Sequence, residues 1–462
     1  MSDFWDPGVW GVMNIIGILL ASLLAASLLK KSVKVLADSL IPTSVLGGGI
    51  LLLISGTYQL FSGVSLFNTT FMGGDGFSFL EMITYHALAL GFISSTFEST
   101  GEELSPTRKT EIFNTGITTV ATYLAQAITG LAVTIIGAKI ITDLFPVAGL
   151  LLPFGYGQGT GQAMNYGNIY ETQYGFIGGK SFGLTIATLG FIFGSMGGVF
   201  HLSWLKRKNH LHKKASPSIR AAIDKAPKQD EIPLFENMDT LTVQIAFIMG
   251  CYLITYVVMY LLGELAPGMK SVIYGFNFLI GVLVTTGIKK FINSLERKKI
   301  LKKNYINDFL MVRIRNFFYD LMVVAGISAI RVSTIGGQVG ILLVICIFGM
   351  LATFFYNRFI AKIFFKDYAE EQFVAMYGML TGTASTGLVL LRELDPEFKT
   401  PVSDNLVYQN IPAIIFGFPL MIIASNAPEA PMRTLMIAII YFVVLNIILF
   451  RSKLFGKKKK VK

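Results

Sequence analysis

The chain has 462 residues, of which 53% are hydrophobic and only 15% are charged, and its formal net charge is +11. About a quarter of the residues in soluble domains are charged, so this composition argues strongly against a soluble globular protein. The basic residues cluster in the gaps between long apolar runs, which is typical of the cytoplasmic loops of a membrane protein and argues against nucleic acid as a partner. Both cysteines lie within apolar runs and give no disulfide or metal signal.

The apolar runs predict an all-α polytopic membrane protein with about eleven spans, because each run is long enough to cross about 30 Å of hydrocarbon as a helix. The spans are expected at 8–29, 40–62, 79–97, 113–137, 179–203, 240–263, 270–288, 310–331, 337–361, 404–424 and 431–450. The N-terminus before the first run has no basic residue, so we expect this run to be a retained span rather than a cleaved signal.

The charge distribution also predicts how the chain is threaded. With the N-terminus outside, every strongly basic gap falls on the cytoplasmic side, as does the C-terminus, which predicts a multi-pass protein of the plasma (inner) membrane. Two further stretches, 144–170 and 370–394, cannot be full spans without inverting everything that follows them. Each is therefore expected to be a re-entrant loop that enters and leaves on one side. Irregular backbone at that depth is tolerated only where protein buries it or where it lines a wet cavity.

The two halves of the chain resemble each other. YHALALGFIS at 85–94 and YDLMVVAGIS at 319–328 share their Tyr, Ile and Ser at an offset of 319 − 85 = 234. Gly155, Gly159 and Thr160 match Gly378, Gly382 and Thr383 at an offset of 382 − 159 = 223. Five spans in each half would give the repeats opposite orientations, which is typical of secondary transporters.

This repeat divides the chain into four regions. Residues 1–204 form the first repeat and 240–424 form the second, each with five spans and one loop. Residues 205–239 are a basic cytoplasmic linker, with a short helix expected around 218–224. Residues 425–462 add the eleventh span and a basic cytoplasmic tail.

Several motifs resemble those of the bacterial sodium/glutamate symporter family. They are IPTSVLGGG at 41–49, GQGTG at 157–161, YGF at 174–176 and the Gly- and Thr-rich YGMLTGTAST at 377–386. The resemblance runs in order through the first ten spans, and the eleventh span is an addition. It implies a sodium-coupled amino-acid carrier that forms a homodimer and moves a transport domain against a fixed scaffold, as an elevator does. Its expected partners are sodium, a small anionic amino acid such as glutamate, and the lipid bilayer.

A physical argument, independent of the resemblance, also favours the two loops as the binding site. A short helix that ends in the membrane presents unpaired N–H groups to anions and unpaired carbonyls to cations. The residues expected to bind substrate are Gly157, Gln158, Gly159, Thr160, Gly161, Gln162, Thr381, Gly382, Thr383, Ser385 and Thr386. The alternative is that the glycines serve only close helix packing, which is common in membranes.

Polar residues on the third and eighth spans are further candidates. Ionisable side chains inside a span are costly and usually functional, so Asp320 is a candidate sodium ligand, with a salt bridge to Arg313 or Arg315 as the structural alternative. Arg331 can receive a substrate carboxylate or act as an interfacial anchor. The remaining candidate ion ligands are the hydroxyls of Ser94, Ser95, Thr96 and Ser328. Hydrogen bonds to the carbonyls of their own helix are the alternative role for these hydroxyls.

Other functions fit the sequence less well. The GYG of residues 155–157 resembles a potassium-channel filter, but such a filter needs four carbonyl segments around one axis, so a cation channel is the weaker alternative. No Gly-Lys-Ser/Thr follows the glycines, which argues against a phosphate loop. No nucleophile or transition-metal cluster predicts an enzyme or a cofactor, and the only metal expected is the sodium ion. A sodium-coupled carrier of a different organic anion remains open.

Overall fold

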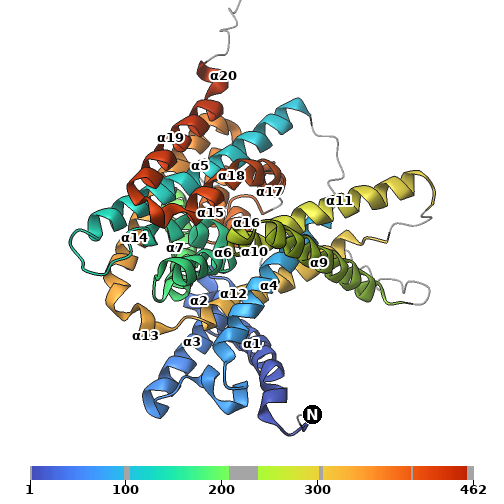
Figure 1. Cartoon of the computed structure of the whole chain (residues 1–462). Helices are drawn as coiled ribbons and strands as arrows, with labels where there is room; N and C mark the ends of the chain where they lie inside the picture. Colours follow the sequence, from blue (N-terminus) through green and yellow to red (C-terminus); the bar gives the residue numbers. More distant parts are fainter. Residues whose placement is uncertain (1–2, 98–104, 208–237, 301–304, 397–398, 455–462) are drawn as a thin grey trace, which may run out of the picture. The chain divides into compact units, whose positions relative to one another are not determined.

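The computed structural model of the chain describes residues 3–97, 105–207, 238–300, 305–396 and 399–454, and these ranges contain helices but no strand (Figure 1). Within them, nine helices are long and apolar enough to cross a membrane, or ten if one bent pair of helices is a single span. The prediction of an all-α polytopic membrane protein is confirmed at this level. The predicted helix at 218–224, most of the linker and the tail from 455 onward lie outside the described residues.

The helices before the linker are α1 (Pro7–Ser32), α2 (Lys34–Asp38), α3 (Thr43–Ser62), α4 (Gly76–Phe97), α5 (Pro106–Gly137), α6 (Leu151–Tyr174) and α7 (Gly179–Arg207). Short 3₁₀ turns, η1 (Leu66–Asn68), η2 (Thr70–Met72) and η3 (Ala148–Leu150), lie between them.

The helices after the linker are α9 (Thr240–Leu265), α10 (Lys270–Gly275), α11 (Asn277–Arg297), α12 (Asp308–Ser328), α13 (Val332–Ile335), α14 (Val339–Phe364), α15 (Ala369–Thr381), α16 (Ala384–Arg392), α17 (Val402–Tyr408), α18 (Asn410–Ser425), α19 (Pro431–Leu449) and α20 (Arg451–Leu454). The 3₁₀ turns here are η4 (Pro267–Met269), η5 (Gly336–Gln338), η6 (Lys366–Tyr368) and η7 (Ala427–Glu429).

Nine of the eleven predicted spans correspond to the apolar helices, and the other two differ from a simple span. The predicted span at 310–331 is the helix α12, but Arg313, Arg315 and Asp320 make it too polar to belong to the apolar set. The predicted span at 404–424 is the pair α17 and α18, which bend by 47° around Gln409. The sequence therefore located both segments but did not reveal the bend.

Local sequence signals explain where several helices begin and end. Ser105 precedes α5, which has Pro106 in its first turn, and the Ser105 hydroxyl accepts a hydrogen bond from the backbone N–H of Arg108 at 3.3 Å. Asp239 and Asn307 cap α9 and α12 in the same way, each accepting from an N–H three residues later at 3.1 Å. Such caps satisfy N–H groups that a first helical turn leaves unpaired.

The helices pack into two compact units. Unit 1 comprises Met1–Leu24, Gly47–Glu102 and Pro217–Ala329, and unit 2 comprises Ala25–Leu46, Glu103–Ser216 and Ile330–Lys462. Each unit takes helices from both halves of the sequence, so the packing units and the proposed repeats are different divisions of the chain.

Unit 1 is organised around α4. This helix packs along α12, and it also contacts α9 and α11 (Figure 1). A methyl group added at Gly91 of α4 would lie 2.4 Å from the ring of Tyr319 on α12, so the glycine admits this aromatic ring. Gly48 of α3 packs against Ile327 of α12, and Gly47 packs against Ser22 of α1. Gly47 and Gly48 of the motif at 41–49 thus make contacts within the chain, and the homodimer stays a prediction.

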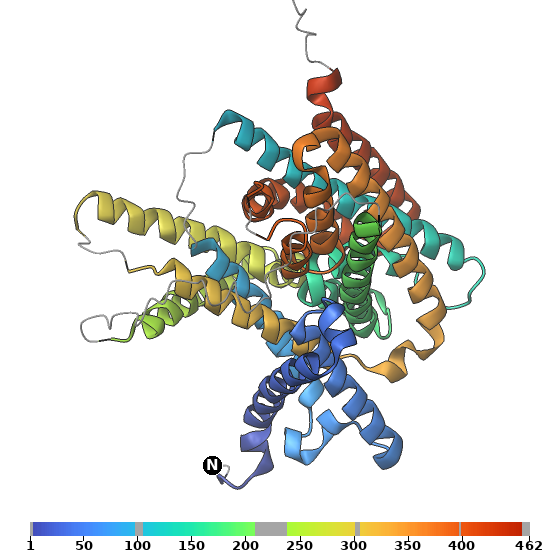
Figure 2. The ribbon, with the colours of Figure 1, turned by 180° about the vertical axis from the view of Figure 1, so that it is seen from behind.

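Unit 2 is held together by close backbone crossings. A methyl group at Gly130 of α5 would lie 2.0 Å from the carbonyl oxygen of Gly149, and one at Gly167 of α6 would lie 2.3 Å from that of Gly179. Helices α7 and α14 also pack against each other, as seen from behind in Figure 2. Such small-residue crossings bring helix backbones together where side chains would otherwise separate them.

Candidate functional site

The first break in a helix lies inside α6, at Gly159. Its backbone has φ 80° and ψ −171°, a conformation that is essentially restricted to glycine, and it divides α6 into the segments 151–158 and 160–174. Each break leaves carbonyls unpaired at the end of one segment and N–H groups unpaired at the start of the next. One of these carbonyls, that of Gly157, accepts a hydrogen bond from the hydroxyl of Tyr123 on α5 at 3.1 Å.

The second break separates α15 from α16 at residues 382–383. Gly382 has φ −124° and ψ −104°, and the hydroxyl of Thr383 caps α16 by accepting from the backbone N–H of Thr386 at 3.3 Å. On the α15 side, the carbonyl of Leu380 accepts a hydrogen bond from the side-chain amide of Gln126 on α5 at 2.8 Å. The two breaks thus use different backbone conformations for the same interruption.

Two helices bring the breaks together within unit 2. Tyr123 and Gln126, three residues apart on α5, reach one carbonyl beside each break. On α7, a methyl group added at Gly190 would lie 2.4 Å from the carbonyl oxygen of Thr381 and 2.8 Å from the ring of Tyr156. The ends of α15 and of the first segment of α6 therefore meet at α5 and α7.

Polar atoms near both breaks are buried without a hydrogen-bonding partner. Both amide atoms of Gln162, which is 1% exposed, have none, and the same is true of Thr381 Oγ1 and Gln126 Oε1. Buried polar groups in native proteins are almost always paired, because an unpaired one costs about 1–3 kcal/mol. The unpaired atoms near these breaks are therefore candidates for ligand contacts.

The structure brings the predicted loop residues together and gives them different exposure. Gly159, Thr160, Gly161, Gln162, Thr381, Gly382 and Thr386 are buried, whereas Gly157, Gln158 and Thr383 are half-buried and Ser385 is exposed. Unpaired buried atoms are found only in part of this set. Gln162 and Thr381 carry them, whereas the Thr383 hydroxyl is already occupied as a helix cap.

The predicted ion ligands on the third and eighth spans belong to unit 1, whereas both breaks belong to unit 2. The hydroxyls of Ser94 and Ser328 are buried and donate to carbonyls of their own helices at 2.7 and 2.8 Å. Thr96 does the same at 2.8 Å, Ser95 is half-buried and Asp320 is exposed. Their proposed role in ion binding stays a prediction.

Arg331 belongs to unit 2, at the residue before α13. Its backbone N–H donates to the hydroxyl of Ser181 on α7 at 3.1 Å, and the residue is half-buried. The chain here turns from Ile330 into a short helix. The predicted contact of Arg331 with a substrate carboxylate remains a prediction.

Sequence reasoning did not identify the two residues of α5 that link the breaks. A signal was present, because Tyr123 and Gln126 are polar residues three positions apart in a helix, and such residues lie on one face. Thr is frequent in the same helix, and its hydroxyls bond back to the helix backbone, so a polar residue there did not stand out.

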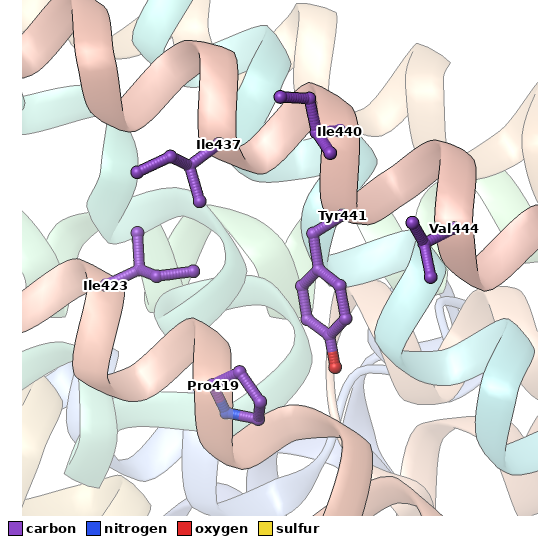
Figure 3. Close-up of a pocket in the computed structure, with 6 residues that line it drawn as sticks. All are labelled: Pro419, Ile423, Ile437, Ile440, Tyr441 and Val444. Carbon is purple, nitrogen blue, oxygen red and sulfur yellow. The ribbon is translucent and has the colours of Figure 1, made fainter.

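An apolar pocket of about 300 Å³ lies elsewhere in unit 2, between α18 and α19 (Figure 3). It is lined by Pro419, Ile423, Ile437, Ile440, Tyr441 and Val444. The one hydroxyl in this lining, that of Tyr441, donates to the carbonyl of Phe416. The pocket has no group suited to an anion or a cation, so the broken helices remain the candidate site.

No protein-family model matches this chain, and no curated protein sequence shows significant similarity to it. Within the described residues, no group of three or more His, Cys, Asp or Glu side chains is arranged to hold a metal ion.

Proposed function

We propose that the protein is a sodium-coupled secondary transporter that imports a small carboxylate, with glutamate as the leading candidate. The observation that carries this proposal is the pair of broken helices between α5 and α7, with buried polar atoms left unpaired beside both breaks. Broken helices in a membrane protein expose backbone groups that bind anions and cations together, which is how many secondary transporters hold substrate and coupling ion.

The positions of the breaks support two inverted repeats, each with one re-entrant loop. The breaks fall at equivalent positions, because Gly382 and Gly159 differ by the offset of 223 found in the sequence. The two carbonyls that accept hydrogen bonds from α5, those of Gly157 and Leu380, are separated by the same offset, since 380 − 157 = 223. Tyr85 and Tyr319, which match at the other offset, lie on α4 and α12, two neighbouring helices of unit 1.

An amino acid with a carboxylate suits the chemistry of Gln162. Its amide nitrogen can donate to a carboxylate oxygen, and its amide oxygen can accept from an ammonium group. Gln162 also lies at the start of the segment 160–174, where the unpaired N–H groups and the helix dipole favour negative charge. A different small organic anion would use the same donors, and the choice between them is left to competition experiments.

The backbone at 155–157 supports a carrier over a channel. Gly155, Tyr156 and Gly157 lie in the helical first segment of α6, with the hydroxyl of Tyr156 donating to the carbonyl of Cys346 at 2.6 Å. A methyl group at Gly155 would lie 2.6 Å from Ile186, so this glycine packs against α7. A selectivity filter needs a row of carbonyls directed at the ion path, and helical carbonyls point along the helix instead.

The proposed transport cycle moves unit 2 as one body relative to unit 1. Both breaks and the α5 and α7 residues that hold them belong to unit 2, so a movement of that unit would carry the intact site. In this proposal unit 1 is the fixed scaffold of a homodimer in the inner membrane, with the N-terminus outside and the C-terminus in the cytoplasm.

Uptake of labelled glutamate by proteoliposomes tests the proposal. We expect saturable uptake that requires an inward sodium gradient and stops when choline replaces sodium. A panel of unlabelled amino acids and dicarboxylates identifies the preferred anion by competition. A flux that does not saturate, or that continues without any sodium gradient, would favour the channel.

A further inference from the structure

Gln126 of α5 presents a buried oxygen atom to the end of α15. The residue is fully buried, and its amide nitrogen donates to the hydroxyl of Thr353 and to the carbonyl of Leu380, both at 2.8 Å. A carbonyl can only accept, so the nitrogen of the amide must face Leu380 and the orientation of the group is determined. Its oxygen, Oε1, therefore points elsewhere and has no partner.

Thr381, the next residue after Leu380, places a second unpaired oxygen at the same helix end. Its Oγ1 is buried without a hydrogen-bonding partner. The hydroxyl of Tyr377 lies close to that of Thr381, but it gives its proton to the carbonyl of Phe193 at 2.9 Å. Tyr377 can therefore only accept from Thr381, and the lone pairs of Thr381 Oγ1 stay available to a cation. The last turn of α15 adds carbonyls for which the interrupted helix supplies no N–H, at the negative end of the helix dipole.

The surroundings of these oxygens are neutral and closed. No charged residue lies within one helical turn of Gln126 on α5 or of Thr381 in the chain. Helix α7 closes the other side, because methyl groups at Gly190 and Gly194 would lie 2.4 Å from the carbonyl oxygen and 3.4 Å from the Cβ of Thr381. A carboxylate-free group of oxygens is suited to a monovalent cation, since divalent ions are usually bound through carboxylates.

We propose that a sodium ion binds at the C-terminal end of α15, with Gln126 Oε1 and Thr381 Oγ1 as side-chain ligands beside backbone carbonyls. The role of this ion in coupling rests on the proposed transport function, but its binding does not. The site lies wholly within unit 2, unlike the hydroxyls of α4 and α12 first considered as ion ligands. Sodium bound there would tie α5 to the second break and leave Gln162 to the substrate.

Thermal unfolding of the full-length protein in detergent tests cation binding without any transport. NaCl is titrated at constant ionic strength against choline chloride, and the melting temperature reports binding, because a ligand of the folded state stabilises it. We expect sodium to raise the melting temperature of the wild type. Gln126→Leu and Thr381→Val should each raise the half-saturating sodium concentration about tenfold, which corresponds to about 1.4 kcal/mol.

Three further variants separate the site from general damage. Gln126→Glu keeps an oxygen at the position of Oε1, and its protonated second oxygen can still donate to the carbonyl of Leu380, so this variant should retain stabilisation by sodium. Tyr123→Phe removes the equivalent hydrogen bond at the first break and should leave the sodium response unchanged, as should Ser94→Ala in unit 1. The proposal would be overturned if Gln126→Leu and Thr381→Val kept the half-saturating sodium concentration of the wild type. It would also be overturned if Ser94→Ala alone lost stabilisation by sodium. Sodium stabilisation without glutamate uptake would instead overturn the proposed substrate and keep this site.

Discussion

The two helix breaks leave opposite chemistry unpaired. At the first break the unpaired side chain is Gln162, which follows the break and offers a donor and an acceptor at the start of a helical segment. At the second break the unpaired atoms, Thr381 Oγ1 and Gln126 Oε1, are oxygens gathered where a helical segment ends. Helix starts attract anions and helix ends attract cations. Under the proposed function, the same kind of helix interruption would bind the substrate at one break and the coupling ion at the other.

The breaks also differ in how strongly they require glycine. Replacing these glycines by alanine should give the largest change in stability and uptake among the variants considered. Gly159→Ala places a side chain at φ 80° and ψ −171°, a conformation that costs about 1–3 kcal/mol for any other residue. Gly382→Ala keeps a negative φ of −124°, and its new methyl group meets Thr386 Oγ1 at 3.0 Å. We expect the melting temperature to fall more in Gly159→Ala, with uptake lost. Equal losses in both variants would show that close packing, not backbone conformation, explains the glycines.

Exchanging the two unpaired glutamines for leucine should separate substrate from sodium. Gln162→Leu should raise the half-saturating glutamate concentration about tenfold, as expected for loss of a hydrogen bond to a charged group. It should leave sodium stabilisation of the purified protein intact. Gln126→Leu should show the reverse pattern: sodium should raise its melting temperature less, and its half-saturating glutamate concentration should change little. Both quantities are measured for both variants. If each variant impaired both ligands equally, the breaks would form one shared site.

Two glycines of α7, Gly190 and Gly194, pack against the second break. We expect Gly190 to tolerate an added side chain less well than Gly194. A methyl group at Gly190 would lie 2.4 Å from the Thr381 carbonyl oxygen, whereas one at Gly194 would lie 3.3 Å from the nearest atom, the nitrogen of Gly382. Gly190→Ala should therefore destabilise the protein by about 1–3 kcal/mol, as overpacking does, and Gly194→Ala by less. Melting temperatures without sodium measure the difference. The same order should appear in the sodium response, because Thr381 is displaced.

Removal of the Tyr123 hydroxyl should have a smaller effect. Tyr123→Phe leaves the carbonyl of Gly157 without its donor and should cost about 0.5–1.5 kcal/mol, since the ring itself still packs on Gly157. We expect a modest rise in half-saturating glutamate in the uptake assay. A loss as large as that of Gln162→Leu would place Tyr123 in direct contact with the substrate.

The smallest effect concerns the entrance of α15 and depends on pH. The hydrogen bond from His201 lowers the pKa of Glu370 below 4.5, with burial opposing this shift. A lowered pKa means that the ionised Glu370 stabilises the folded protein above its unfolded pKa and that this stabilisation is lost as pH falls through its folded pKa. Glu370→Gln should slightly lower the melting temperature near neutral pH and match the wild type in acid. A difference that persists well below pH 4.5 would show that its origin is not the charge.

Much of the helical framework follows from the sequence, and the details of the site do not. Long apolar runs marked nine of the spans, and the glycines at 155–161 and 378–382 marked the region of both breaks. The pattern of α12 could not show that Asp320 is exposed while Ser328 is buried, because periodicity does not say which neighbour covers a face. The bend at Gln409 was missed although polar Gln409 and Asn410 are followed there by Pro412, which cannot donate a helical hydrogen bond.

The sequence by itself determined the helical membrane class, the offset of 223 and the glycine on which the first break depends. These depend on local properties, namely hydrophobic length and the positive φ that only glycine adopts readily. Only the tertiary structure decided which polar atoms are left unpaired. Gln126 and Leu380 are 254 residues apart. The hydroxyl of Thr383 accepts from the N–H of Thr386, whereas no backbone N–H donates to that of Thr381. Whether a buried oxygen is free depends on every neighbour brought to it by folding, and no local pattern contains that information.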